Sequence, residues 1–182
     1  EWVFFEIACH ANGGMSLGVY RDTLDDEVGY LVKSAKVKFA YAEDQEQVDK
    51  LINVQKKLKT KIKVIYDDPR GLEKLKNPNV INMKDLASVG KKQLNKNNKV
   101  YENLINQVPG ETVSVLCTTS GTTSNPKLAM LPAKKFINHI SNYLKVDPKS
   151  HLDEYVSVLP FPWIMEQTYG VGFNLLSGMK VN

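Results

Sequence analysis

Residues 117–131, CTTSGTTSNPKLAML, concentrate small hydrogen-bonding side chains between two apolar runs. Six hydroxyl residues surround one glycine, and a lysine closes the segment: Thr118, Thr119, Ser120, Gly121, Thr122, Thr123, Ser124 and Lys127. Hydroxyl groups hydrogen-bond phosphoryl oxygens in many orientations, glycine lets backbone amides turn toward an anion, and lysine adds positive charge. The residue types therefore predict a phosphate-binding loop. A solvent-exposed polar hairpin is the alternative that composition alone leaves open.

The spacing of the segment argues against a Walker phosphate loop, which reads G-x-x-x-x-G-K-[ST] between a strand and a helix. The distance from Gly121 to Lys127 is correct, but Pro126 replaces the second glycine and Leu128 replaces the Ser or Thr. Proline lacks a backbone donor, and leucine cannot hold a magnesium ion. The apolar run KLAML favours a strand, so we predict strand–loop–strand. We also expect the loop to be mobile without nucleotide, because it carries no large apolar anchor.

Apolar periodicity around this loop predicts alternating helices and strands. Thr23 is expected to cap the second helix, and residues 72–98 show the weakest pattern, with a short helix only over residues 83–89. The other expected helices lie before Gly13 and over residues 24–35, 45–59, 100–108, 133–145 and 164–176. The expected strands lie over residues 16–20, 37–41, 62–68, 112–118, 127–131 and 154–161, and a last strand begins near residue 178. Alternating strands and helices imply parallel pairing. The predicted fold is therefore α/β, a layered, mostly parallel sheet with helices on both faces.

Composition argues against several other classes of protein. The net charge of +4 comes mostly from lysine-rich runs, which lack the interleaved aromatic and arginine residues of nucleic-acid sites, so no nucleic-acid partner is expected. The cysteines Cys9 and Cys117 and the three histidines show no metal-binding spacing, so no metal ligand is predicted. Such cysteine use favours a reducing, cytoplasmic location. No apolar run approaches the roughly 18 residues of a membrane span.

Two segments resemble the adenylate-forming (AMP-binding) enzymes. Residues 118–127, TTSGTTSNPK, are similar to the family's hydroxyl-rich signature, although Ser124 and Leu128 stand where glycine is usual. Residues 154–182, EYVSVLPFPWIMEQTYGVGFNLLSGMKVN, resemble a segment of the long-chain acyl-CoA synthetase branch that reads Leu-Pro-Leu-Ala-His-Ile-x-Glu. Leu159, Pro160, Ile164 and Glu166 match that segment, and Trp163 replaces the histidine. The opening residues are similar to the family's first α/β units, so the resemblance covers nearly the whole chain.

The resemblance implies an ATP-dependent activation of a fatty acid, through an acyl-adenylate, to acyl-CoA. It implies ATP, Mg²⁺ and coenzyme A as cofactors and co-substrates, with catalytic roles for Lys127 and Thr122. The implied nucleotide-binding residues are Thr119, Ser120, Gly121, Thr122, Thr123, Ser124, Asn125 and Lys127. Trp163 and Glu166 fall at the implied substrate pocket. Core filling by Trp163 and a helix-start charge for Glu166 stay open as alternatives.

The resemblance identifies the chain as a partial N-terminal AMP-binding domain, with opening α/β units over residues 1–110 and the phosphate loop with the next unit over residues 111–182. The family's Tyr-Gly-x-Thr-Glu motif and its lid lysine do not occur here, and both ends look cut. Activity is therefore expected of a longer parent, a long-chain fatty acid–CoA ligase, and not of this piece alone. The alternative is a catalytically silent nucleotide- or lipid-binding module. Expected partners are small molecules; peripheral membrane association of the parent and its oligomeric state stay open.

Overall fold

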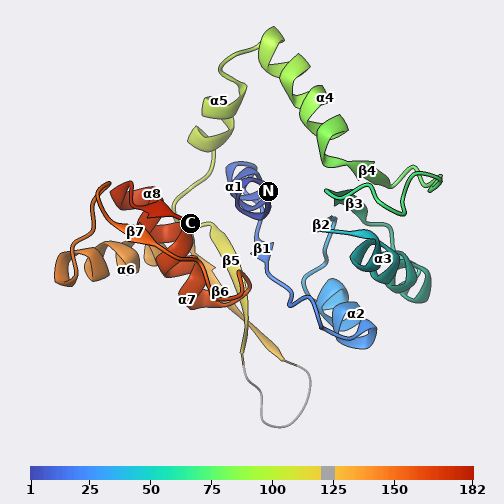
Figure 1. The fold of residues 1–182 in the computed structure, drawn as a ribbon, viewed down its shortest axis with the longest axis horizontal. Helices are drawn as coiled ribbons and strands as arrows, with labels where there is room; N and C mark the ends of the chain where they lie inside the picture. Colours follow the sequence, from blue (N-terminus) through green and yellow to red (C-terminus); the bar gives the residue numbers. More distant parts are fainter. Residues whose placement is uncertain (120–125) are drawn as a thin grey trace. The chain divides into compact units, whose positions relative to one another are not determined.

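The computed structural model describes residues 1–119 and 126–182 (Figure 1). The chain forms two compact units, residues 1–5 with 21–103 and residues 6–20 with 104–182. Helix α1 (Trp2–Ala11) begins in the first unit and ends in the second. The assignment of residues 1–110 and 111–182 to successive parts of one domain stays a prediction.

The first unit is built on a parallel three-stranded sheet. Its strands β2 (Phe39–Ala42), β3 (Lys63–Tyr66) and β4 (Val80–Asn82) lie in that order, and Val64 is paired with both Ala40 and Val80. Helices α2 (Asp25–Ser34) and α3 (Gln45–Leu58) pack on each other, and α4 (Met83–Lys96) follows β4 directly. One buried cluster of its core consists of Ala42, Val48, Val64 and Leu72, with Leu51, Ile52, Tyr66 and Val80 packed against it.

The second unit holds two small sheets and their helices. In one sheet, β5 (Val113–Thr119) lies between β1 (Ser16–Leu17), which is parallel to it, and β6 (Lys127–Pro132), which is antiparallel. In the other, β7 (Glu154–Tyr155) pairs in parallel with β8 (Lys180–Val181). The helices are α5 (Val100–Asn106), which spans the boundary between the units, α6 (Ala133–Val146), α7 (Ile164–Glu166), a π-helical segment (Gln167–Phe173) and α8 (Asn174–Ser177). Ile140, Phe173 and Met179 form the core here.

These elements confirm the predicted mixed α/β fold with mostly parallel strands. Within the described residues, every strand pair is parallel except β5 with β6. A strand begins at Lys127, as predicted, and it pairs with the strand that precedes the hydroxyl-rich segment. The strand–loop–strand interpretation is therefore confirmed for both flanks of the loop.

Four local predictions need correction. Thr23 does not cap α2, because the N-cap position is the next residue, Leu24. The Leu24 side chain makes no capping hydrogen bond. The weakly patterned region contains β4 and a full-length α4, whose first turn is capped by Asn82 accepting a hydrogen bond from the Lys84 amide at 2.8 Å. The strand predicted over residues 154–161 is only β7, and the helix over 164–176 contains the π-helical segment.

Candidate active site

The β5–β6 hairpin brings together the two described residues at the ends of the hydroxyl-rich segment. Thr119 and Lys127 form the last pair of the antiparallel ladder, and Thr119 Oγ1 donates a hydrogen bond to the Lys127 carbonyl oxygen at 3.4 Å. Both residues are exposed. The two ends of the segment thus lie on adjacent strands, with the Thr119 hydroxyl at one end and the Lys127 ammonium group at the other. An anion bound there would meet the Lys127 ammonium, and the Thr119 hydroxyl would donate to the anion only by giving up its bond to the Lys127 carbonyl oxygen.

The remaining predicted loop residues lie outside the described residues. They are Ser120, Gly121, Thr122, Thr123, Ser124 and Asn125, and the expected mobility of the loop falls on the same positions. Their roles therefore stay predictions.

A polar network ties β5 to α1 and β1. Glu6, 5% exposed, accepts a hydrogen bond from Ser16 Oγ at 2.7 Å, and His10 Nε2 lies 3.0 Å from the same hydroxyl oxygen. Ser16 Oγ also lies 3.3 Å from the Ser114 carbonyl oxygen on β5. A hydroxyl has a single hydrogen, so when Ser16 donates to Glu6, His10 must donate through Nε2. The network joins α1 and β1 to β5, the strand that leads into the hydroxyl-rich segment.

Burial acts against the charged forms of His10 and of the two cysteines near this network. Burial lowers the pKa of His10, although the Glu6 carboxylate and the Ser114 backbone act in the opposite direction. Burial, with a smaller effect of the Glu6 charge, raises the pKa of both the Cys9 and Cys117 thiols. A thiol that stays protonated is a poor nucleophile, so these cysteines are suited to packing. Glu6 was not among the predicted site residues; its signal in the sequence is a lone carboxylate within the apolar helix WVFFEIACHA.

Glu166, a predicted pocket residue, is fully buried and bonded within the second unit. Tyr155 Oη donates to Glu166 Oε2 at 2.8 Å, and Ser157 Oγ donates to Oε1 at 2.5 Å. Tyr155 and Ser157 are two residues apart, the spacing that places extended side chains on the same side of the chain. Burial, reinforced by the bond to Glu166 and its charge, raises the pKa of Tyr155 to about 12. Glu166 therefore ties Tyr155 and Ser157 to α7.

The two residues after Glu166 are also buried polar side chains that the sequence did not single out. Gln167 is 4% exposed, and its Nε2 donates to the Phe161 carbonyl oxygen at 2.9 Å. Thr168 is 2% exposed and donates to the Ile164 carbonyl oxygen at 3.0 Å. Glu166 and Gln167 thus bind residues 155, 157 and 161 of the preceding chain, and Thr168 bonds to the preceding helical turn. Their only sequence signal was three consecutive polar residues, EQT, inside an otherwise apolar stretch.

Two glycines of the π-helical segment make room for these contacts. A Cβ atom on Gly170 would lie 2.4 Å from Glu166 Oε1, and one on Gly172 would lie 2.5 Å from Ile140 Cδ1. Contacts this short cannot be accommodated without displacing a neighbour. Gly170 is therefore required by the position of the Glu166 carboxylate, and Gly172 by close packing on α6.

Trp163 stands at the surface of the described chain. Its side chain is 45% exposed, and its amide donates to the Pro160 carbonyl oxygen at 2.9 Å just before α7. Trp163 is therefore not part of the core of the described chain, and its role stays a prediction. Among the described residues, no hydrogen bond or ion pair joins Trp163 or Glu166 to Thr119 or Lys127. The flanks of the hydroxyl-rich segment and the two predicted pocket residues thus form two separate sets of contacts.

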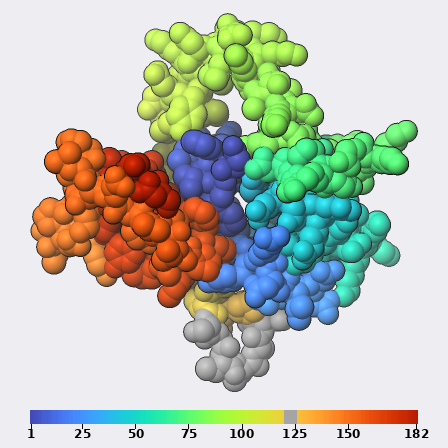
Figure 2. Space-filling model, in the orientation of Figure 1, coloured from blue at the N-terminus to red at the C-terminus, as the bar shows by residue number. Residues whose placement is uncertain are grey.

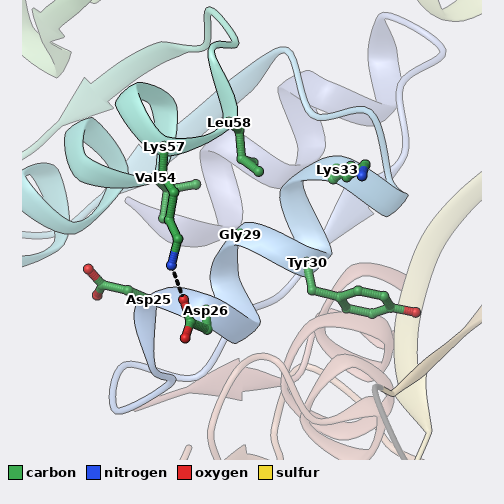
Figure 3. Close-up of a pocket in the computed structure, with 8 residues that line it drawn as sticks. All are labelled: Asp25, Asp26, Gly29, Tyr30, Lys33, Val54, Lys57 and Leu58. Carbon is green, nitrogen blue, oxygen red and sulfur yellow. Dashed lines mark hydrogen bonds and ion pairs between the residues drawn. The ribbon is translucent and has the colours of Figure 1, made fainter.

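A pocket in the first unit contains none of the predicted site residues. It lies between α2 and α3, is lined by residues that include Asp26, Tyr30 and Val54, and has a volume of about 180 Å³ (Figure 3). An ion pair between Lys57 and Asp26 crosses it, and both side chains are largely exposed. Ligand sites usually enclose about 300–1,000 Å³. We therefore do not assign a substrate to this pocket.

In the described parts of the chain, no group of three or more His, Cys, Asp and Glu side chains is placed to hold a metal ion. None of the helices in those parts is both long enough and apolar enough to cross a membrane.

The fold is similar to several solved structures. The crystal structure of VinN superposes with a TM-score of 0.71 over 99% of this chain and 40% of that chain, at 19% identity. The structure of ATP-bound MatB from Rhodopseudomonas palustris gives a TM-score of 0.67 over 99% of this chain and 32% of that chain, at 14% identity. At such identities the similarity supports the fold alone.

Relatives and a family match extend this similarity to the sequence. Long-chain-fatty-acid–CoA ligase 1 of Cavia porcellus is 30% identical over 179 residues, 92% of this chain and 24% of that protein. Long-chain-fatty-acid–CoA ligase 5 of Rattus norvegicus is 30% identical over 176 residues, 92% of this chain and 25% of that protein. The chain thus spans about a quarter of the length of these relatives. The family described as AMP-binding enzyme matches residues 1–182. Because that match covers the whole chain, the protein belongs to the AMP-binding enzyme family.

Proposed function

We propose that the protein containing this chain activates a long-chain fatty acid. The fatty-acid carboxylate would attack the α-phosphate of ATP and release pyrophosphate. The thiol of coenzyme A would then attack the acyl carbonyl of the acyl-adenylate, lose its proton, form the thioester and release AMP. The relatives named above, both long-chain-fatty-acid–CoA ligases, support this substrate class. The complete reaction is proposed for the whole parent, since this chain corresponds to about a quarter of those proteins.

The observation that carries the proposal is the cross-strand pair of Thr119 and Lys127 at the two ends of the hydroxyl-rich segment. Carboxylate and ATP are both anions, so the first step needs positive charge and positioning more than a general base. Lys127, with Thr122 and the other loop hydroxyls, would bind the phosphates as pyrophosphate leaves. Mg²⁺ would arrive with those phosphates and neutralise part of their charge.

We assign the acyl end of the site to the segment around Trp163. An indole that is 45% exposed can form the wall of an apolar pocket, whereas the Glu166 carboxylate already has a hydroxyl donor on each oxygen. We therefore propose that Glu166 supports the acyl pocket by positioning this segment, with Trp163 as the contact residue. We also propose that the parent protein is cytoplasmic.

Pyrophosphate exchange by the intact parent, assayed with fatty acids of increasing chain length, tests the assignment of Lys127. Lys127→Ala removes a charge that acts on the leaving phosphate, so the loss belongs to the transition state. One lost contact of this kind costs on the order of 2–4 kcal/mol, or about 30- to 1,000-fold in rate. The KM for the fatty acid should change little.

Lys134→Ala is the matched control for this experiment. Lys134 is also exposed, and it pairs with Glu111 at 3.1 Å on the surface, away from the loop. Its removal should change the exchange rate by less than about twofold. Equal rates for wild type and Lys127→Ala would refute the role of Lys127. A parent that binds nucleotide or fatty acid but exchanges no pyrophosphate would favour the silent binding module. This chain alone is predicted to release no pyrophosphate.

A further inference from the structure

Helix α4 is amphipathic along its whole length. At 3.6 residues per turn, one arc of about 160° carries its apolar residues together with Gln93. The opposite arc carries the charged residues and the small polar residues Ser88 and Asn95. The apolar arc consists of Met83, Leu86, Ala87, Val89, Gly90 and Leu94. Such a division is typical of a helix that lies between an apolar and an aqueous phase.

The apolar arc of α4 is exposed from Leu86 to Leu94 in the described structure. None of the α4 residues is buried, and Leu86, Val89 and Leu94 are 37%, 52% and 46% exposed. By contrast α3, which has the same length, buries Val48 and Val54. Figure 1 shows α4 continuing from β4 and extending away from the sheet of the first unit, and Figure 2 shows its atoms, drawn in green, at the surface. An apolar face of this kind is usually covered by a partner.

The charge around α4 indicates the chemistry of that partner. Residues 83–99 contain five lysines and one aspartate, a net charge of +4 (5 − 1). Lys91 and Lys96 flank the apolar arc on its two sides, and in the described residues no carboxylate pairs with the lysines of α4. Lysines on both sides of the apolar arc can bind anionic lipid headgroups while the apolar side chains insert between the headgroups and the acyl chains.

We propose that α4 binds the surface of anionic membranes, with Leu86, Val89 and Leu94 inserted at the headgroup boundary and Lys91 and Lys96 on the lipid charges. The net charge of +4 favours this occupant over an uncharged apolar surface such as a domain face. The inference is independent of the proposed function, because it rests on the helix alone. A helix in this role lies on the membrane without crossing it.

Vesicle co-sedimentation of the 182-residue chain and of the intact parent tests the proposal. The vesicles are pure phosphatidylcholine, or the same lipid with about 30 mol% phosphatidylserine. Both proteins should bind the anionic vesicles at least about tenfold more tightly than the neutral ones. Raising the salt from about 0.1 M to about 1 M shortens the Debye length from about 10 to 3 Å and should remove most of this preference.

Two variants separate α4 from the rest of the surface. Leu86→Ser/Val89→Ser/Leu94→Ser should weaken binding at least about tenfold, whereas Val146→Ser/Leu152→Ser/Val158→Ser, at positions 86%, 81% and 73% exposed, should not. Lys91→Glu/Lys96→Glu should abolish the anionic preference, whereas Lys56→Glu/Lys61→Glu, with the same change in charge, should retain it. Circular dichroism checks that each variant is folded.

Three results would overturn the proposal. The first is equal binding of the α4 and control variants. The second is binding by the chain but not by the parent, because the α4 face would then be covered by the rest of the protein. The third is loss of self-association in the α4 variants without loss of lipid binding, which would identify a second copy as the occupant.

Discussion

Removing the Tyr155 hydroxyl provides the sharpest test of how the Glu166 carboxylate is held. Tyr155→Phe deletes one oxygen atom and leaves Glu166, which is 0% exposed, with a single donor from Ser157 at 2.5 Å. Because Glu166 has no access to water, no solvent molecule can replace the 2.8 Å bond that is lost. The substitution changes no charge and creates almost no cavity, so it isolates the hydrogen bond.

The expected cost follows from the charge of the acceptor. A hydrogen bond to a charged group contributes about 1.5–3 kcal/mol, against about 0.5–1.5 kcal/mol between neutral groups. We therefore expect Tyr155→Phe to lower the free energy of unfolding of the second unit by about 2 kcal/mol. In a Glu166→Gln background, where the acceptor is neutral, the same change should cost only about 1 kcal/mol. The difference, a coupling of about 1 kcal/mol, lies in the range measured for directly bonded pairs.

Urea unfolding followed by tryptophan emission measures both quantities. A Trp2→Phe background leaves Trp163, three residues before Glu166, as the single tryptophan, so the emission follows the second unit. Tyr20→Phe, at a tyrosine that is 39% exposed, is the matched control and should change stability by less than about 0.5 kcal/mol. If Tyr155→Phe costs no more than this control, or costs the same with Glu and Gln at position 166, the carboxylate does not anchor the segment.

Three further predictions concern the same unit and can use the same emission probe. Gly170→Ala should destabilise it by about 1–3 kcal/mol, because the new Cβ would lie 2.4 Å from Glu166 Oε1; a gain in thermal stability, as for glycine in an unstrained helix, would contradict this. The folded pKa of His10 lies below its ordinary value of 6.5, so the folded state binds fewer protons than the unfolded state. The contribution of His10 to stability should thus be constant above pH 6.5 and decrease as the pH drops below it, and a urea midpoint equally acid-sensitive in His10→Gln would exclude this histidine. The pKa of Tyr155 is raised from 10.0 to about 12, so its contribution should be complete below pH 10 and lost as the pH rises toward 12, with Tyr155→Phe removing that dependence.

The phosphate-loop region was largely determined by the sequence, because its signals are local. Apolar runs on both sides of the hydroxyl residues predicted two strands, and β5 and β6 pair there with Thr119 opposite Lys127. Turn, strand and loop preferences depend on neighbouring residues, so they can be recognised without the rest of the chain. The same holds for the family resemblance, which rests on one short motif and one longer segment of matching residues.

The buried polar groups were decided by the tertiary structure alone. A glutamate in a sequence looks the same whether it faces water or a hydroxyl donor, and Glu166 was equally compatible with a pocket and with a helix start. Its burial requires that the Tyr155 and Ser157 hydroxyls both donate to the carboxylate. It also requires that residue 170 has no Cβ atom next to the carboxylate. Likewise, the position of Ser16 between Glu6 and Ser114 joins residues 98 apart in sequence. Local sequence preferences do not predict such contacts, because a buried polar group is stable only when it has a hydrogen-bond partner, and that partner can be distant in the sequence.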